Sequence, residues 1–269
     1  MPTPLHARAL AAASALLLLA LAGCSGDSDA EPAQGETEQV VRAEVGDCRV
    51  LTPAAVASAS DDTATVDCTE DHTAETYAAG EIPEEQADLD WDSPELAAWA
   101  YETCAGGFAD FLRADESTVM RTILSWAWFR PTEEAWEAGE RHYRCDVVGG
   151  GEQVVELRDL PETAEGLLEG IPDDRWMVCA SGPRVSGSTK VACDEEHTWR
   201  AVTTIKVGDA EEGYPGDRFV EITTRDYCSD SVGGWLGYPD SYDYGYTYFG
   251  EAEWGVGNRR SVCWAKTAQ

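Results

Sequence analysis

Two copies of one cysteine–histidine pattern constrain the fold of this chain more than any other feature. The first copy is Val-Asp-Cys-Thr-Glu-Asp-His-Thr at residues 66–73, and the second is Val-Ala-Cys-Asp-Glu-Glu-His-Thr at residues 191–198. Each copy is followed by the pattern Trp-x2-Gly-x-Arg-x3-Cys, at residues 136–145 and 254–263. Two patterns that recur in the same order indicate one structural unit that the chain uses twice.

The first 23 residues have the pattern of a lipoprotein signal peptide. Arg8 precedes an apolar run that ends in Leu-Ala-Gly-Cys at residues 21–24, the lipobox pattern of bacterial lipoproteins. The run is shorter than the ~20 residues that a membrane-spanning helix needs. We therefore expect cleavage before Cys24, diacylation of its thiol, and a lipid anchor at the extracytoplasmic face of the cell membrane. An ordinary secretory signal with an unrelated cysteine is the alternative.

Eight further cysteines divide evenly between the two copies, and such a set in an exported chain is typical of disulfides. Four cysteines allow three pairings. We favour the pairing in which the first two close a hairpin-like segment and the last two tie a helix to the final strand. The expected bridges are Cys48–Cys68, Cys104–Cys145, Cys179–Cys193 and Cys228–Cys263. Zinc is the alternative, but the chain has no Cys-x2-Cys pair and its thiols are widely spaced.

The hydrophobic patterning predicts an α+β fold of two tandem disulfide-stapled units, each with antiparallel strands and one main helix. Ser93 and Pro94 open a helix that apolar spacing carries to about residue 113. In the second unit we expect a helix over residues 218–231.

Three consecutive glycines, at residues 149–151, mark the boundary between the units. We expect a signal peptide at 1–23, an acidic disordered tether at 24–40, a first unit at 41–148, a linker at 149–173 and a second unit at 174–269. Within the linker, residues 152–158 are expected to add an edge strand and residues 160–168 to form a short amphipathic helix.

Several of these features together resemble the septum formation family of actinobacterial envelope proteins. They are the lipobox, Gly46-Asp47-Cys48, the first cysteine–histidine pattern with Glu75, a helix that carries Cys104, and the pattern from Trp136 to Cys145. The likeness is good over about residues 44–148 and continues at 174–265 as a diverged copy, which has Arg200 in place of Glu75. The resemblance implies an exported or lipid-anchored protein linked to cell division, and it brings no catalytic residues with it.

His72 and His197 are the candidate functional histidines, because each follows a cysteine by four positions and has acidic residues beside it. We expect both to be structural imidazoles that bond to loop backbone beside a disulfide, since two copies of one active site in one chain are uncommon. Contact with a ligand or partner is the second interpretation. Catalysis by a general base, with Glu70 or Glu195 nearby, is the third.

Tyrosines gather near the end of the second unit, and Tyr242, Tyr244 and Tyr246 are the candidate binding residues among them. Aromatic rings on a glycine-rich loop can stack on sugars or anchor a protein partner. Packing in the core of the second unit is the alternative.

The chain shows no convincing metal site. Asp88, Asp90 and Asp92 have the spacing that begins a calcium loop, but Ser93 stands where that loop needs glycine and Trp99 where it needs glutamate. We favour a solvated loop that caps the following helix, with weak calcium binding as the alternative, and we predict no metal and no cofactor.

The sequence favours a binding protein over an enzyme. It contains no Gly-x-Ser-x-Gly, His-Glu-x2-His, phosphate-loop or dinucleotide pattern. The net charge of −32, from 51 acidic and 19 basic residues, excludes nucleic acid as a partner. We expect a non-enzymatic, lipid-anchored binding or scaffold protein of the cell envelope, held at the membrane through Cys24 and engaging an envelope protein or wall component. A ligand-binding sensor lipoprotein, or less favourably a hydrolase that uses His72 or His197, is the alternative.

Overall fold

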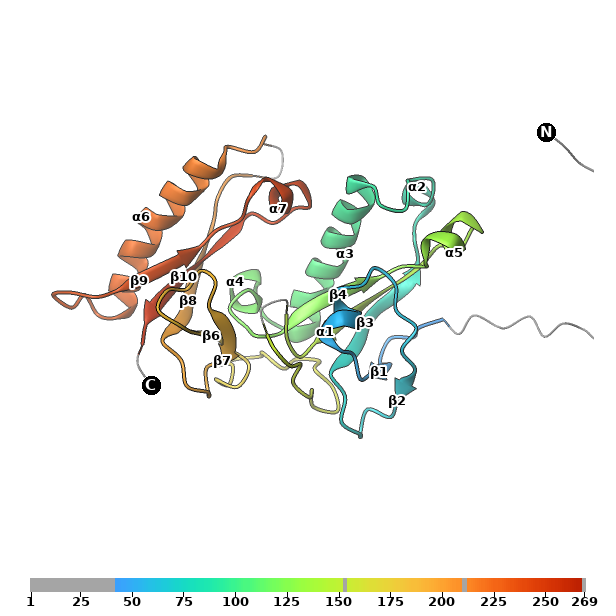
Figure 1. Cartoon of the computed structure of the whole chain (residues 1–269), viewed down its shortest axis with the longest axis horizontal. Coiled ribbons are helices and arrows are strands. Elements are labelled where there is room, and N and C mark those ends of the chain that lie inside the picture. Colours follow the sequence, from blue (N-terminus) through green and yellow to red (C-terminus); the bar gives the residue numbers. More distant parts are fainter. Residues whose placement is uncertain (1–41, 152–153, 210–211, 268–269) are drawn as a thin grey trace, which may run out of the picture. The chain divides into compact units, whose positions relative to one another are not determined.

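Two five-stranded antiparallel sheets with the same strand order make up the fold (Figure 1). The computed structural model describes residues 42–151, 154–209 and 212–267. The predicted signal peptide, Cys24 and the whole of the expected tether therefore lie outside the described residues. The described part of the chain contains no helix that is long and apolar enough to cross a membrane.

The first sheet has the order β2-β1-β3-β5-β4, and the second has the order β7-β6-β8-β10-β9. The first consists of β1 (Cys48–Arg49), β2 (Thr65–Val66), β3 (Ala74–Glu81), β4 (Ser125–Phe129) and β5 (His142–Val148). The second consists of β6 (Val178–Ser181), β7 (Thr189–Ala192), β8 (Trp199–Lys206), β9 (Tyr244–Thr247) and β10 (Arg260–Lys266). Because the strands correspond one to one, the predicted α+β class of two similar units is confirmed.

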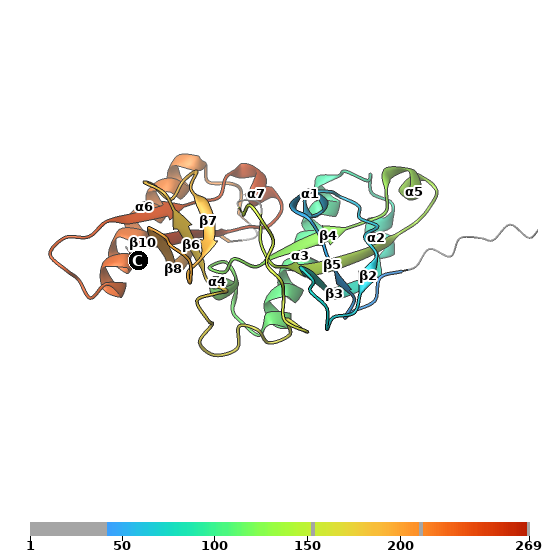
Figure 2. The ribbon, with the colours of Figure 1, turned by 60° about the horizontal axis from the view of Figure 1, so that its bottom comes forward.

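Each sheet carries one long helix, α3 (Pro94–Leu112) in the first unit and α6 (Asp217–Trp235) in the second (Figures 1 and 2). The Ser93 side chain caps α3 by accepting a hydrogen bond of 3.1 Å from the Leu96 N–H, and Pro94 occupies the first turn. The helix ends where Arg113 adopts a left-handed conformation with φ 54°. The second helix runs four residues beyond the predicted end at 231.

Both long helices bury a stripe of residues spaced four apart, as expected for a helix that packs on a sheet. The stripe of α3 is Leu96, Ala100, Cys104, Phe108 and Leu112, and that of α6 is Val220, Thr224, Cys228 and Val232. One cysteine of each stripe forms a disulfide with the last strand of its own unit, β5 or β10. Each of the other two disulfides joins a short strand, β1 or β6, to the loop that follows its neighbour, β2 or β7. The observed pairs, which are those favoured from the sequence, are Cys48–Cys68, Cys104–Cys145, Cys179–Cys193 and Cys228–Cys263.

Short helices connect the strands. They are α1 (Pro53–Val56), α2 (Glu84–Ala87), α4 (Glu116–Val119), α5 (Glu133–Glu137) and α7 (Glu251–Gly255). In α5 and α7 a tryptophan is buried, and an arginine five residues later lies over its ring at 4.0 Å and 3.7 Å. The repeated Trp-x2-Gly-x-Arg pattern is therefore a short helix followed by a cation–π contact.

The linker does not form the predicted helix at 160–168, and this expectation was wrong. Two of its main-chain N–H groups bond to the first unit: Leu160 N donates to the His72 carbonyl at 2.8 Å, and Gly166 N donates to the Phe111 carbonyl at 2.8 Å. The segment makes only a turn at its end, where Leu167 N donates to the Ala164 carbonyl at 3.1 Å. Gly166 also has φ of +72°, which a helix does not allow. The apolar residues at helical spacing, Leu160, Ala164 and Leu168, instead join the core of the first unit.

The predicted edge strand at 152–158 is also absent from the described residues of that stretch, 154–158. The chain there turns tightly, because Val154 N donates to the Gly151 carbonyl at 3.1 Å and Arg158 N donates to the Gly149 carbonyl at 2.8 Å. These bonds within the turn replace the ladder that an edge strand would have made.

Main-chain hydrogen bonds join the two units directly. Ile123 N donates to the Trp176 carbonyl at 2.9 Å, and Val178 N donates to the Arg121 carbonyl at 2.8 Å, on either side of a bridge between Thr122 and Met177. Residues 41–269 accordingly form one compact body that contains both units.

Candidate functional site

The two candidate histidines have the same buried environment. The Nδ1 atom of His72 lies 2.8 Å from the Glu70 carbonyl oxygen, and that of His197 lies 2.7 Å from the Glu195 carbonyl oxygen. The two side chains are buried, and no described residue hydrogen-bonds their Nε2 atoms. In each case the glutamate contributes its main-chain carbonyl to the ring, which is the geometry of a structural imidazole that fixes its own loop.

The tyrosines of the second unit lie on and beside β9, next to α6. Tyr242, Tyr244 and Tyr246 pack against the cluster around the Cys228–Cys263 disulfide. The Tyr242 hydroxyl donates to the Ser229 carbonyl at 2.7 Å, and the Tyr246 hydroxyl donates to Glu221 at 3.4 Å. The structure thus places all three beside the core of the second unit. Binding at these rings remains a prediction.

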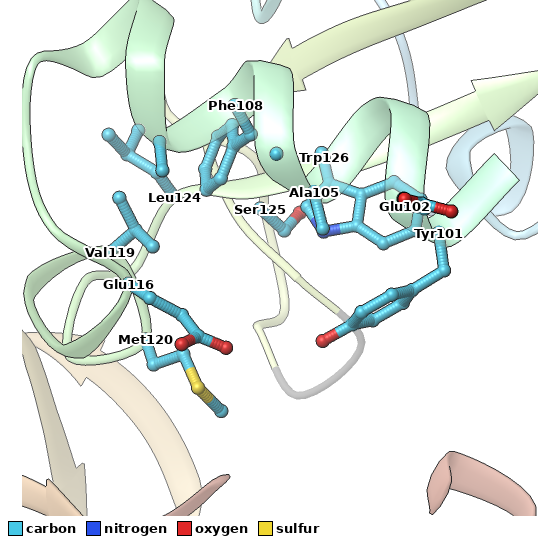
Figure 3. A pocket seen from close by; sticks show the side chains of 12 residues that line it. Tyr101, Glu102, Ala105, Phe108, Glu116, Val119, Met120, Leu124, Ser125 and Trp126 are labelled. Atoms are coloured by element: carbon cyan, nitrogen blue, oxygen red, sulfur yellow. The ribbon is translucent and has the colours of Figure 1, made fainter. Parts of the chain in front are cut away.

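An apolar pocket lies in the first unit, between α3, α4 and β4. Its volume is about 450 Å³, which falls within the range of small-molecule sites. Figure 3 shows the aliphatic side chains of Val119, Met120 and Leu124 across from the rings of Tyr101 and Trp126. The two rings meet edge to face, with centroids 5.7 Å apart. We call this cavity the first-unit pocket.

Small residues on α3 create this space. Ala105, Gly106 and Ala109 line the pocket, and a Cβ atom added to Gly106 would meet nothing within 4 Å. The sequence signal is present as Ala105-Gly106-Gly107, but what lies opposite these residues depends on β4, which is distant in the chain. The pocket and its aromatic walls were therefore missed in the sequence analysis.

The rim of the pocket is acidic. Glu102 and Glu116 line it, and the Glu116 carboxylate accepts a hydrogen bond from Arg260. Burial raises the pKa of the Tyr101 hydroxyl, and the nearby Glu116 carboxylate raises it further. Tyr101 is therefore a neutral hydrogen-bond donor at ordinary pH, beside two carboxylates and an apolar floor.

The helix that forms one wall is fixed by a capping interaction. The Asp115 carboxylate accepts a hydrogen bond of 2.7 Å from the Thr118 N–H at the start of α4. This hydrogen bond lowers the pKa of Asp115, so the cap remains ionised well into the acidic range. The cap positions Glu116, Val119 and Met120 against the pocket.

The corresponding place in the second unit is filled. Trp128 pairs with Cys145 in the first sheet, and Tyr246 pairs with the corresponding Cys263 in the second. Leu124 and Tyr242 each lie four residues before these paired residues, so they occupy equivalent positions. The Tyr242 ring lies against Gly233, where its hydroxyl oxygen is 2.6 Å from the position of an added Cβ atom. One tyrosine therefore occupies in the second unit the space that the first unit leaves open.

No cluster of three or more His, Cys, Asp or Glu side chains among the described residues could hold a metal ion. The residues with calcium-loop spacing, Asp88, Asp90 and Asp92, lead directly into the start of α3. A turn there is closed by the Ser93 N–H, which donates to the Asp90 carbonyl at 3.0 Å.

Fold and pocket together define an α+β protein of two similar units, each with two internal disulfides, and with an apolar pocket in the first unit. The sequence profile of the family described as Septum formation matches residues 45–263, which spans both units. The chain therefore belongs to the septum formation family. No curated protein and no solved structure matched it.

Proposed function

We propose that this chain is a non-catalytic, lipid-anchored binding protein at the extracytoplasmic face of the cell membrane, and that it acts in cell division. Membership of the septum formation family supports the link to division. Four disulfides support an oxidising compartment outside the cytoplasm. The Leu-Ala-Gly-Cys pattern that ends at Cys24 supports the anchor.

The observation that carries the binding role is the first-unit pocket. An apolar cavity with a few polar groups at its rim is the common form of a ligand site. Its floor suits an aromatic or aliphatic side chain, while Glu102 suits a basic group beside that side chain, since Glu116 already pairs with Arg260. A partner protein that presents an apolar residue flanked by lysine or arginine would match both the pocket and the net charge of −32.

A hydrolase is the less favoured alternative. A general base must reach the proton that it removes. In His72 and His197 the Nδ1 atoms face main-chain carbonyls, and both rings are buried. This environment argues for a structural role of the two histidines.

The binding role is tested by filling the pocket from α3. Gly106→Trp would place a ring in the cavity, and Gly106→Ala is the matched control because its Cβ atom meets open space. The probe is the neutral apolar dye N-phenyl-1-naphthylamine, whose fluorescence rises on burial. We expect the wild type and Gly106→Ala to bind the dye alike and Gly106→Trp to bind it at least five-fold more weakly. Equal binding by all three would contradict a role for this pocket.

The anchor is tested by Cys24→Ala. We expect the variant to lose labelling by radioactive palmitate and to leave the membrane fraction. An unmodified Cys24 in the mature wild-type protein would overturn the lipid anchor while leaving the dye experiment unaffected.

A further inference from the structure

Among the described residues, the second unit leaves open a face that the linker covers in the first. The two faces begin at equivalent hydrogen bonds: Gly149 N donates to the Thr73 carbonyl at 2.9 Å, and Thr267 N donates to the Thr198 carbonyl at 2.9 Å. In the first unit the chain continues across this face. Leu160 N donates a hydrogen bond to the His72 carbonyl. The N–H groups of Gly166 and Leu168 donate to the carbonyls of Phe111 and Leu112 at the end of α3. The covering segment has no helix or strand as far as Ala164, and it then makes a turn in which Leu167 N donates to the Ala164 carbonyl at 3.1 Å.

On the same face of the second unit lies a cavity of about 250 Å³, to which the first unit contributes Arg121. Its walls include His197, Arg200 and Trp235, which correspond to His72, Glu75 and Phe111. We call this cavity the second-unit pocket.

One substitution helps to open the second-unit pocket. Val202 takes the place of Tyr77, whose ring in the first unit stacks on Phe111 with centroids 5.6 Å apart. Trp235 lacks that partner and is 50% exposed. No described main-chain N–H reaches the His197 carbonyl as Leu160 N reaches that of His72. The acceptor that the covering segment uses in the first unit therefore remains available.

The charge at the centre of this face is reversed. In the first unit Glu75 accepts hydrogen bonds from the Ala164 N–H at 2.6 Å and from the Thr163 hydroxyl at 2.9 Å, so its occupant supplies donors. Arg200 has only donors and a positive charge. An occupant of the second-unit pocket must therefore supply an acceptor at this point, and a carboxylate fits an arginine best.

A second arginine strengthens the preference for an anion. Arg121 also lines the pocket, and no carboxylate of the described residues lies within ion-pair distance of it. Its side chain donates instead to the Ser117 carbonyl at 3.0 Å and to the Thr118 hydroxyl at 3.4 Å. Burial lowers the pKa of Arg121. The charge of the Asp115 carboxylate opposes this shift, and the positive charge of Arg200 adds to it. One guanidinium nitrogen of Arg200 donates to Asp174, and the other N–H donors of Arg200 can bind a ligand.

We propose that the second-unit pocket binds an extended acidic peptide segment of a partner protein, with its carboxylate at Arg200 and Arg121 and its main chain at the His197 carbonyl. The peptide would bind as residues 158–168 bind to the first unit, except that it supplies a carboxylate to Arg200 where the linker supplies hydrogen-bond donors to Glu75. This site is separate from the first-unit pocket, so the inference does not depend on ligand binding there.

The probe that tests it is a synthetic, fluorescently labelled peptide of residues 159–169 in which Thr163→Asp supplies the carboxylate. The unsubstituted peptide is the comparison. Binding to the full chain is followed by fluorescence anisotropy and by the NMR signal of the Trp235 indole N–H. The variant Arg200→Glu restores the residue of the first unit. Arg218→Glu makes the same charge change at an exposed position of α6 and serves as the control.

We expect the Thr163→Asp peptide to bind at least five-fold more tightly than the unsubstituted peptide, and Arg200→Glu to weaken it about ten-fold. Arg218→Glu should leave the affinity within two-fold. The proposal fails if neither peptide shifts the Trp235 signal up to millimolar concentration, if the two peptides bind alike, or if the two variants weaken binding equally. A parallel titration with N-acetylaspartate separates a peptide from a free carboxylate, because equal affinity for the small molecule would overturn the peptide as the ligand.

Discussion

The Glu75 carboxylate accepts a hydrogen bond of 2.6 Å from the main-chain N–H of Ala164. Glu75 belongs to β3 and is buried, whereas Ala164 belongs to the linker. A buried carboxylate is costly unless it is hydrogen-bonded, so the linker supplies partners to a group that the folded sheet has enclosed. The linker is therefore part of the first unit's structure.

Removing this carboxylate should loosen the linker. Glu75→Ala leaves the Ala164 N–H and the Thr163 hydroxyl without their acceptor, and we expect it to lower the free energy of unfolding by about 2–3 kcal/mol. The control is Glu162→Ala, an exposed glutamate of the same linker, which should change stability by less than about 0.5 kcal/mol. Urea unfolding measures both. Equal effects of the two variants would show that the Glu75 contacts do not hold the linker.

The disulfides should differ in their contribution to stability. Loop closure predicts about 4 kcal/mol for Cys104–Cys145, which are 41 residues apart, and about 3 kcal/mol for Cys179–Cys193, which are 14 apart. Paired cysteine-to-alanine variants of each bridge, unfolded in urea without reductant, measure the two losses. A larger loss for the shorter loop would contradict a chain-entropy origin of the stabilisation.

Tyr77 should make stability fall at alkaline pH. Its hydroxyl donates to the Cys104 carbonyl at 2.7 Å, and burial, with the nearby Asp146 charge, raises its pKa above the ordinary value of about 10. The folded state therefore binds this proton more tightly than the unfolded state. Its contribution is complete below about pH 10 and is lost as the pH rises further.

Tyr77→Phe should reduce this alkaline loss and lower stability at neutral pH by about 1 kcal/mol through the missing hydrogen bond. Urea midpoints between about pH 8 and 11 measure the dependence, with Tyr248→Phe, on a partly exposed ring, as control. The same slope in wild type and Tyr77→Phe would refute the assignment.

Adjacent glycines of α3 should respond differently to a methyl group. Gly106→Ala places its Cβ atom in open space within a helix, so we expect a gain of about 0.5–1 kcal/mol. Gly107→Ala places its Cβ atom 3.2 Å from a Tyr77 ring carbon, and the crowding should cancel much of that gain. Thermal unfolding distinguishes the two. An equal gain at both positions would mean that Tyr77 moves freely.

Local signals explain why some elements were predictable from the sequence. The start of α3 follows from Ser93 and Pro94, and its course follows from apolar residues four apart. The repetition of the four cysteines favours pairing within each unit, which leaves three pairings. The observed one follows from the expected elements, since the first two cysteines flank a hairpin-like segment and the last two lie on a helix and the final strand. These features depend on residues close together in the chain or on the repeat itself.

The linker and the two pockets could not be predicted in the same way. Leu160, Ala164 and Leu168 have helical spacing, but their segment gains more from hydrogen bonds to His72, Glu75 and α3 than from its own helical turns. The first-unit pocket depends on Leu124 standing where the second unit has Tyr242. Both outcomes rest on contacts between residues far apart in the sequence.

The measurement that tests the binding role most directly is affinity purification of the anchored protein from envelope membranes, with co-purifying proteins identified by mass. Wild type is compared with Gly106→Trp and Arg200→Glu, and with the controls Gly106→Ala and Arg218→Glu. We predict at least one envelope protein that is retained by the wild type and both controls and is lost from one of the two pocket variants. Identical sets of co-purifying proteins from all five forms would contradict a binding function at these pockets.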